Sequence, residues 1–175
     1  MLKMFVTQLT GLFKKLSENE EFTFEDGARL LAQAPVGDGT MYVYGVGEMK
    51  AVEFEALEGA EPLKRAQRLN PAVLESLSEA DRVVIFSRFA CDEQAIEVAR
   101  TLKMKQIPFV TVATVSDETD ELPALADVHI DLGLKKALLP DEMGGRVGYP
   151  SGMAALFVYY GLKLTIDEIL VEYDL

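Results

Sequence analysis

The chain has 175 residues, of which 49% are hydrophobic and 26% are charged, a composition typical of a soluble globular protein. Its length predicts one domain over residues 1–175. The net charge of −12 argues against a nucleic-acid partner and against an anionic membrane surface, because both require a basic face. The one cysteine, Cys91, cannot form an intrachain disulfide, and no apolar run approaches the length of a membrane span. We therefore expect a cytoplasmic protein.

The N-terminal part of the chain predicts two helices. Apolar residues at helical spacing give the first one a single apolar stripe: Leu2, Phe5, Leu9, Leu12 and Leu16. Thr23, with Asp26 three residues later, resembles a capping box and predicts a second helix that continues to about Ala34. The wide stripe of the first helix, and the nearly uniformly apolar segment GMAALFVYYG further on, predict a homo-oligomer.

Two successive strand–turn–helix units form the centre of the predicted fold. The apolar run at residues 41–44 ends at Gly45-Val46-Gly47, and a helix-forming segment follows directly. Residues 83–86 form the second strand, followed by a turn and the helical segment QAIEVARTLK. With further strands at residues 109–113 and 128–131, the pattern predicts an α/β fold with a parallel sheet between two layers of helices. The turns of such a sheet gather at one edge, where a functional site is expected.

The segments between these units are less regular. Residues 61–68 (EPLKRAQR) fit either a short strand or a helical turn, and both interpretations stay open. Asn70 before Pro71 predicts the N-cap of a short helix.

The C-terminal part predicts a long loop and two helices. Residues 140–150 form the loop, and Ser151 is expected to cap an apolar helix that ends at Gly161. Thr165 and Glu168 resemble a capping box and predict a separate last helix.

Three segments carry a family resemblance: MYVYGVGEMKAVEF, VVIFSRFACDEQAIEVARTLKMKQIPFVTVAT and ADVHIDL. With them the chain resembles the sugar isomerase (SIS) domain superfamily, most of all the phosphoheptose isomerases, and within it an uncharacterised branch. The resemblance implies a three-layer α/β/α sandwich with a parallel sheet. It also implies a homodimer or homotetramer built partly through the N-terminal helices, and a phosphosugar site at the C-terminal edge of the sheet.

The first turn matches the family pattern G-x-G-x-S at Gly45 and Gly47, while Met49 stands where the resemblance implies serine. The helix that follows directs its free N–H groups and positive dipole end back towards this turn. We expect a small anion to bind at Gly45, Val46 and Gly47, with Lys50 in reach. A turn that needs unusual backbone dihedral angles, without any ligand, explains the two glycines equally well.

The second turn corresponds to the phosphate-binding pattern S-x-S-G-x-T of the family, which only Ser87 matches. Arg88 can bind phosphate bidentately, and the long loop that carries Arg146 can close over the site. Asp92 stands where the resemblance implies a ligand-binding threonine, although an aspartate is also a good helix cap. The predicted ligand is a phosphorylated sugar or a similar small anion, bound by Ser87, Arg88, Asp92 and Arg146 together with the first turn.

Catalytic residues have less support. Aldose–ketose isomerisation moves a proton between two carbons and needs a base and a proton donor. The resemblance implies a glutamate in the helix after the first turn, for which Glu58 is the best candidate beside Glu55. It also implies a histidine in the C-terminal helix, which has none. The only histidine, His129, lies in a predicted strand, where a packed residue is the usual role. No His and Cys residues are spaced as metal ligands, and we expect neither metal nor cofactor.

Three functions stay open at this point. The first is a binding module for a phosphorylated small molecule, favoured by Lys50, Arg88 and Arg146 at the expected turns of an otherwise acidic chain. The second is a sugar-phosphate isomerase of the phosphoheptose isomerase type. The third is a dimerising scaffold without a ligand.

Overall fold

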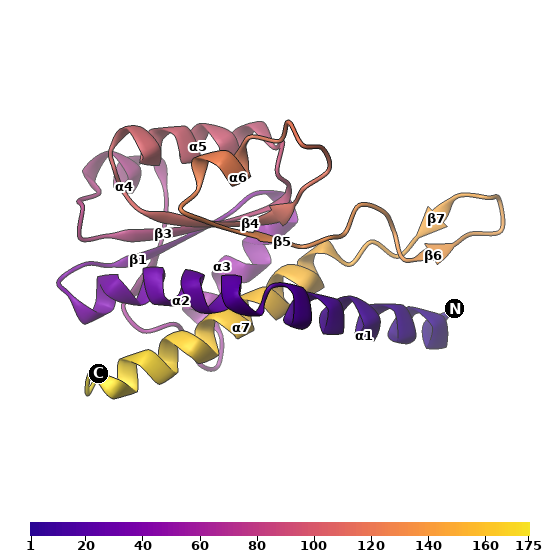
Figure 1. Ribbon diagram of the computed structural model, residues 1–175, viewed down its shortest axis with the longest axis horizontal. Coiled ribbons are helices and arrows are strands. Elements are labelled where there is room, and N and C mark those ends of the chain that lie inside the picture. The colour runs from indigo at the N-terminus through magenta and orange to yellow at the C-terminus, as the bar shows by residue number, and fades with distance from the viewer.

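A five-stranded parallel sheet forms the centre of the computed structural model, which describes residues 1–175 (Figure 1). The strand order is β2-β1-β3-β4-β5, and every neighbouring pair is parallel. The strands are β1 (Met41–Gly45), β2 (Ala66–Arg68), β3 (Arg82–Phe89), β4 (Phe109–Thr114) and β5 (Val128–Asp131). The four predicted strands and the parallel sheet are therefore confirmed. Residues 61–68, which the sequence left undecided, contain the short edge strand β2.

Helices cover both faces of this sheet (Figure 1). One face carries α4 (Pro71–Ser76), α5 (Glu93–Met104) and α6 (Leu122–Leu125). The other carries α2 (Glu21–Val36), α3 (Lys50–Glu58) and α7 (Ser151–Glu172), with α1 (Leu2–Asn19) extending beyond the sheet. The predicted three-layer α/β/α arrangement is confirmed. None of these helices combines the length and apolar character that a membrane span requires.

The two central strands are buried on both faces, which explains their continuous apolar runs. Alternate residues of β3 and β4 contribute to separate cores on the two sides. Val84, Phe86, Val110 and Val112 pack towards α2, α3 and α7, whereas Val83, Ile85, Phe109 and Ala113 pack towards α5.

The C-terminal part of the chain differs from its prediction. A single helix, α7, runs from Ser151 to Glu172, where a break at Gly161 and a separate last helix were expected. Gly161 does not end the helix, because its role is packing: a Cβ there would lie 3.2 Å from the ring of Phe24 on α2. Thr165 is an interior residue whose hydroxyl donates to the Gly161 carbonyl, so it caps no helix. Ser151 is the first residue of α7 and Pro150 is the N-cap.

Two further boundaries differ. Helix α2 begins at Glu21, so Thr23 lies inside its first turn and no side chain caps the helix. The long loop at residues 140–150 contains part of an antiparallel hairpin, β6 (Leu139–Pro140) and β7 (Arg146–Val147). The Asn70 cap is confirmed, because its side chain accepts a hydrogen bond from the N–H of Val73.

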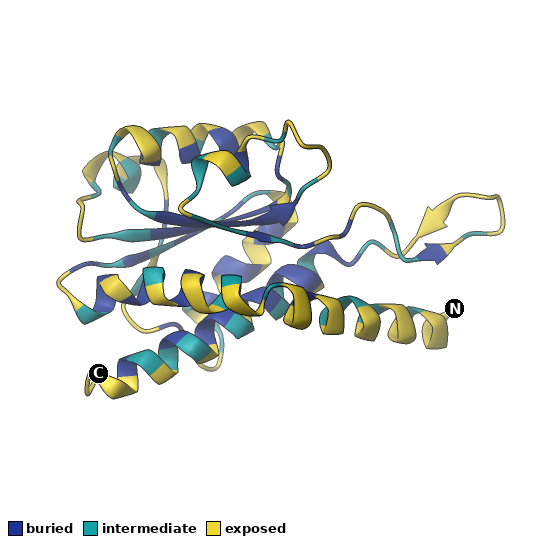
Figure 2. Cartoon of the chain, in the orientation of Figure 1, coloured by how far each residue is buried: buried dark blue, intermediate teal, exposed yellow.

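Apolar side chains remain exposed on α1 and on the outer side of α7 (Figure 2). They include Leu2, Met4 and Val6 on α1, and Leu164 and Val171 on α7. The homodimer or homotetramer stays a prediction that these surfaces motivate.

The turn after β1 depends on Gly45, where a Cβ would lie 2.4 Å from the carbonyl oxygen of Met49. We predict that Gly45→Ala lowers the free energy of unfolding by about 2–3 kcal/mol, because the backbone of the following helical turn must shift. Chemical denaturation monitored by circular dichroism measures this change.

Gly11→Ala is the matched control, since Gly11 lies in α1 with no atom within 4 Å of the added Cβ. There the alanine is expected to stabilise the protein by up to about 1 kcal/mol. Equal effects of the two substitutions would contradict the role given to Gly45.

Candidate functional site

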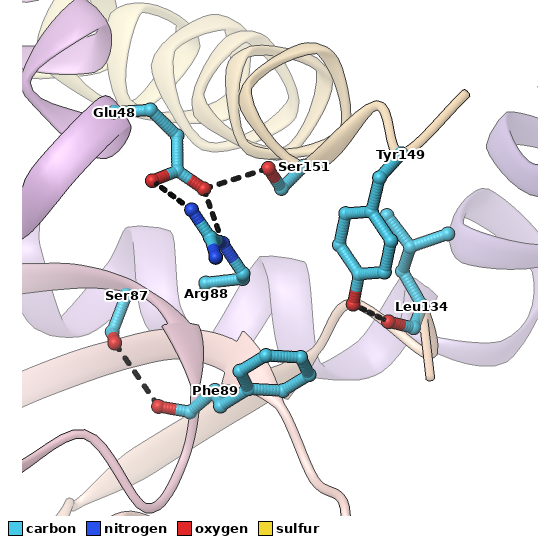
Figure 3. A network of polar contacts seen from close by, with 7 residues as sticks. All are labelled: Glu48, Ser87, Arg88, Phe89, Leu134, Tyr149 and Ser151. Atoms are coloured by element: carbon cyan, nitrogen blue, oxygen red, sulfur yellow. Dashed lines mark hydrogen bonds and ion pairs between the residues drawn. The ribbon is translucent and has the colours of Figure 1, made fainter. Parts of the chain in front are cut away.

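Turns from separate parts of the chain meet beyond the C-terminal end of the sheet. The turn after β1 contains one turn of 3-10 helix, η1 (Gly47–Met49), and leads into α3. The end of β3 is irregular, with a shift in its pairing with β4 between Phe86 and Phe89. The start of α7 lies next to both, as Figure 3 shows through its first residue, Ser151.

An ion pair joins these turns (Figure 3). Arg88 donates from Nε to Glu48 Oε1 at 2.6 Å and from Nη2 to Glu48 Oε2 at 2.7 Å. The Ser151 hydroxyl donates to Glu48 Oε1 at 2.8 Å. Because both oxygens of the carboxylate are used by a planar guanidinium, this is the bidentate geometry that gives arginine its specificity for carboxylate and phosphate.

The surroundings of Glu48 strongly favour its ionised form. The hydrogen bond from Arg88 is the largest cause that lowers its pKa, followed by the Ser151 hydroxyl and the residue's own backbone N–H. Together they outweigh partial burial and bring the pKa of Glu48 to about 2, from an ordinary 4.5. Since the folded-state pKa lies below the ordinary one, the pair contributes stability above about pH 4.5 and loses that contribution as the pH falls towards 2.

A hollow of about 390 Å³ opens beside this ion pair, lined by Glu48, Arg88, Phe89, Tyr149 and Ser151. The Tyr149 hydroxyl donates to the carbonyl of Leu134, and the rings of Phe89 and Tyr149 meet edge to face at 6.2 Å (Figure 3). Burial raises the pKa of Tyr149, so its hydroxyl stays protonated and keeps this hydrogen bond. The hollow thus combines a cation, a hydroxyl and two aromatic walls.

The residues predicted at the first turn lie beside this hollow, and two of their N–H groups already have partners. Gly45 N–H donates to Glu53 Oε1 at 2.6 Å, and Val46 N–H donates to the carbonyl of Phe86 at 2.9 Å. Gly47 has a φ of +59°, which favours glycine for conformational reasons alone. Lys50 is exposed at the start of α3.

The residues predicted at the second turn have separate positions. Ser87 is fully buried, and its hydroxyl donates to the carbonyl of Phe89 at 3.0 Å (Figure 3). Asp92 accepts hydrogen bonds from the N–H groups of Gln94 and Ala95, so its role as the cap of α5 is confirmed. Of the predicted residues at this turn, Arg88 alone lines the hollow.

Arg146 lies in the hairpin that projects past the edge of the sheet (Figure 1). Its guanidinium donates to the carbonyls of Ala137 at 2.6 Å and Leu138 at 2.9 Å. These contacts hold the hairpin to the preceding segment, and Arg146 does not line the hollow.

Glu53 is the residue at this edge that sequence reasoning missed. Its side chain is only 6% exposed and joins two elements. It accepts from Gly45 N–H and from Arg68 Nε, the latter at 2.9 Å. The signal was available, since Glu53 falls on the same helical stripe as the apolar residues Met49 and Ala56.

Glu58, the candidate base, lies at the other end of α3. The helix rises by about 12 Å between Lys50 and Glu58, so Glu58 is directed away from the turns. Its side chain is 59% exposed and pairs with Arg68 Nη2 at 3.2 Å.

The single histidine packs inside the fold. His129 Nδ1 forms a hydrogen bond with the Thr111 hydroxyl at 2.7 Å, and burial lowers the pKa of the imidazole. Residues 1–175 contain no group of three or more His, Cys, Asp or Glu side chains placed to hold a metal ion.

Solved structures with the same fold belong to the SIS class. Vibrio vulnificus NanR complexed with ManNAc-6P is 14% identical, with a TM-score of 0.74, over 99% of this chain and 64% of that one. Escherichia coli CFT073 c3406 in complex with a sugar phosphate is 15% identical, with a TM-score of 0.72, over 97% and 89%. The phosphoheptose isomerase GmhA of Neisseria gonorrhoeae is 14% identical, with a TM-score of 0.62, over 96% and 100%. The chain therefore has the SIS-type α/β fold that its sequence resembles.

Within this class of fold, the chain belongs to the DUF2529 family, described as a domain of unknown function, whose model matches residues 1–170. It is also 42% identical to the uncharacterised protein YwjG of Bacillus subtilis (strain 168) over 173 residues, which cover 99% of each chain.

Glu53 anchors the turn after β1, and we predict that Glu53→Ala lowers the free energy of unfolding by about 2–3 kcal/mol. The substitution removes the acceptor for Gly45 N–H and the buried partner of Arg68. Urea denaturation provides the measurement.

Glu58→Ala removes the exposed partner of the same arginine and serves as the control, with an expected change within about 0.5 kcal/mol. The account of Glu53 would be wrong if the two substitutions had the same cost.

Proposed function

We propose that the protein binds a phosphorylated sugar, or a similar small phosphorylated molecule, in the hollow beside Arg88. The observation that carries this proposal is the Glu48 carboxylate, which is held by the two Arg88 donors and the Ser151 hydroxyl. The same donors suit a phosphate group, since arginine binds carboxylate and phosphate with the same fork of N–H groups. The two SIS-fold structures solved with bound sugar phosphates, NanR and c3406, support this class of ligand.

The surroundings add a weaker attraction for an anion. Ser151 begins a helix of 22 residues, so the positive end of the α7 dipole lies at the hollow. Lys50 and the turn at Gly45, Val46 and Gly47 lie on its η1 side and extend the proposed site. The aromatic rings of Phe89 and Tyr149 offer an apolar wall to the carbon side of a sugar. Ser87 and Asp92 support the second turn from within, through the hydrogen bonds described above.

Binding without isomerisation agrees better with the carboxylates of α3. Glu53 is buried between Gly45 and Arg68, Glu55 accepts from the Tyr160 hydroxyl at 2.6 Å, and Glu58 pairs with Arg68. Each has an internal partner, and none lines the hollow. An isomerase would need one of them to leave its partner and to work with a proton donor. A scaffold without a ligand would bind no phosphorylated molecule at all.

Isothermal titration calorimetry with glucose 6-phosphate as the probe tests this proposal. We expect saturable binding to the unaltered protein, weakened at least about tenfold by Arg88→Ala, since a charge-assisted contact contributes about 1.5–3 kcal/mol. Ser151→Ala is expected to weaken binding by a smaller factor, because it removes one neutral donor.

Arg100→Ala is the matched control, because Arg100 forms a similar exposed pair with Glu121 on another part of the surface. It removes the same charge and should leave the affinity unchanged. If glucose 6-phosphate and inorganic phosphate both fail to bind, or if Arg88→Ala and Arg100→Ala act equally, the proposed site is wrong.

A further inference from the structure

The anion seat of this protein, defined here as the Arg88 guanidinium with the Ser151 hydroxyl, already contains an anion. Glu48 uses the Nε and Nη2 donors of Arg88 and the Ser151 hydroxyl at the same time. A ligand that needs these donors must therefore displace the Glu48 carboxylate. Its side chain is 36% exposed and sits on a one-turn helix at the surface, so rotation into water is open to it.

The tether makes Glu48 a strong competitor for the seat. A side chain that is fixed to the chain beside its partners acts at a high effective concentration, and its binding loses no translational freedom. A free carboxylate offers Arg88 the same two oxygens and the same single charge, but it must pay that association cost. Carboxylate ligands, and phosphodiesters with their single charge, therefore gain nothing over Glu48.

A phosphate monoester differs from Glu48 in both charge and geometry. It carries a charge of about −1.5 to −2 at pH 7 and three strong acceptor oxygens. It can occupy both Arg88 donors and the Ser151 hydroxyl and still present an oxygen to the start of α7. The other nearby carboxylate, Asp92, is held by the first N–H groups of α5, so it does not occupy the seat.

We infer that Glu48 is a specificity-determining residue, which admits dianionic phosphate monoesters to the anion seat and excludes monoanionic ligands. This inference rests on the proposed function and concerns the same site. It assigns Glu48 a role in selecting the ligand, in addition to joining two turns. It also explains how an acidic residue can belong to a phosphate site: the carboxylate defines the minimum charge that a ligand must bring.

Calorimetry with two probes, glucose 6-phosphate and gluconate, tests the inference on the full chain. The unaltered protein should bind glucose 6-phosphate and show no measurable binding of gluconate. Glu48→Gln keeps the size of the side chain but removes its charge. It should tighten glucose 6-phosphate at least about tenfold and make gluconate binding measurable, because a neutral amide competes less well for Arg88.

Glu55→Gln is the matched control, since it removes the same charge from α3 at a residue outside the hollow. It should leave both affinities unchanged. Thermal unfolding checks that the variants are folded, and Glu48→Ala serves as a second variant with the same expected outcome.

The possible results separate the two claims. If glucose 6-phosphate binds and depends on Arg88, but Glu48→Gln and Glu48→Ala leave both affinities unchanged, the selective role of Glu48 is wrong and the proposed function stands. If Glu48→Gln and Glu55→Gln tighten binding equally, the effect is one of net charge and the inference is wrong. If neither probe binds to any of these proteins, the proposed function fails and the inference fails with it.

Discussion

The bidentate ion pair between Glu48 and Arg88 is the contact on which the C-terminal edge of this sheet depends. It connects the turn after β1 with the end of β3, 40 residues apart in the chain, and through Ser151 it reaches the start of α7. The 3-10 turn that carries Glu48 forms only because Gly45 lets the backbone approach closely, and buried Glu53 then holds that turn to the strand. Loss of the pair would free three elements at once.

The same contact changes how the SIS-type fold is used here. The family pattern implied a turn rich in hydroxyl groups for the phosphate, whereas this chain has a buried serine and a helix-capping aspartate at that turn. The donors that remain at the surface are those of Arg88 and Ser151, and Glu48 neutralises them when no ligand is bound. An acidic chain can in this way keep an anion site without leaving an unpaired cation exposed.

Much of the fold could be predicted from the sequence, because strands buried on both faces read as continuous apolar runs and are bounded by clear turns. The edge strand β2 could not, since Ala66–Arg68 is short and only partly buried. The uninterrupted α7 was missed because Gly161 resembles a helix end, while its actual role is contact with Phe24. At the site, Arg88 was predicted, but its partner depends on tertiary distance that no local pattern encodes. Glu53 was different: its position on the buried stripe of α3 was visible in the sequence.

The ionisation of Glu48 itself tests the central claim most directly, through the pH titration of its side-chain carboxyl carbon by ¹³C NMR, assigned with Glu48→Gln. The account predicts that Glu48 stays ionised well below the ordinary pKa of 4.5, towards a value of about 2. It also predicts that Arg88→Ala returns the pKa towards the ordinary value. A Glu48 that titrates near pH 4.5 in the unaltered protein, or that does not respond to Arg88→Ala, would show that its carboxylate does not occupy an anion seat.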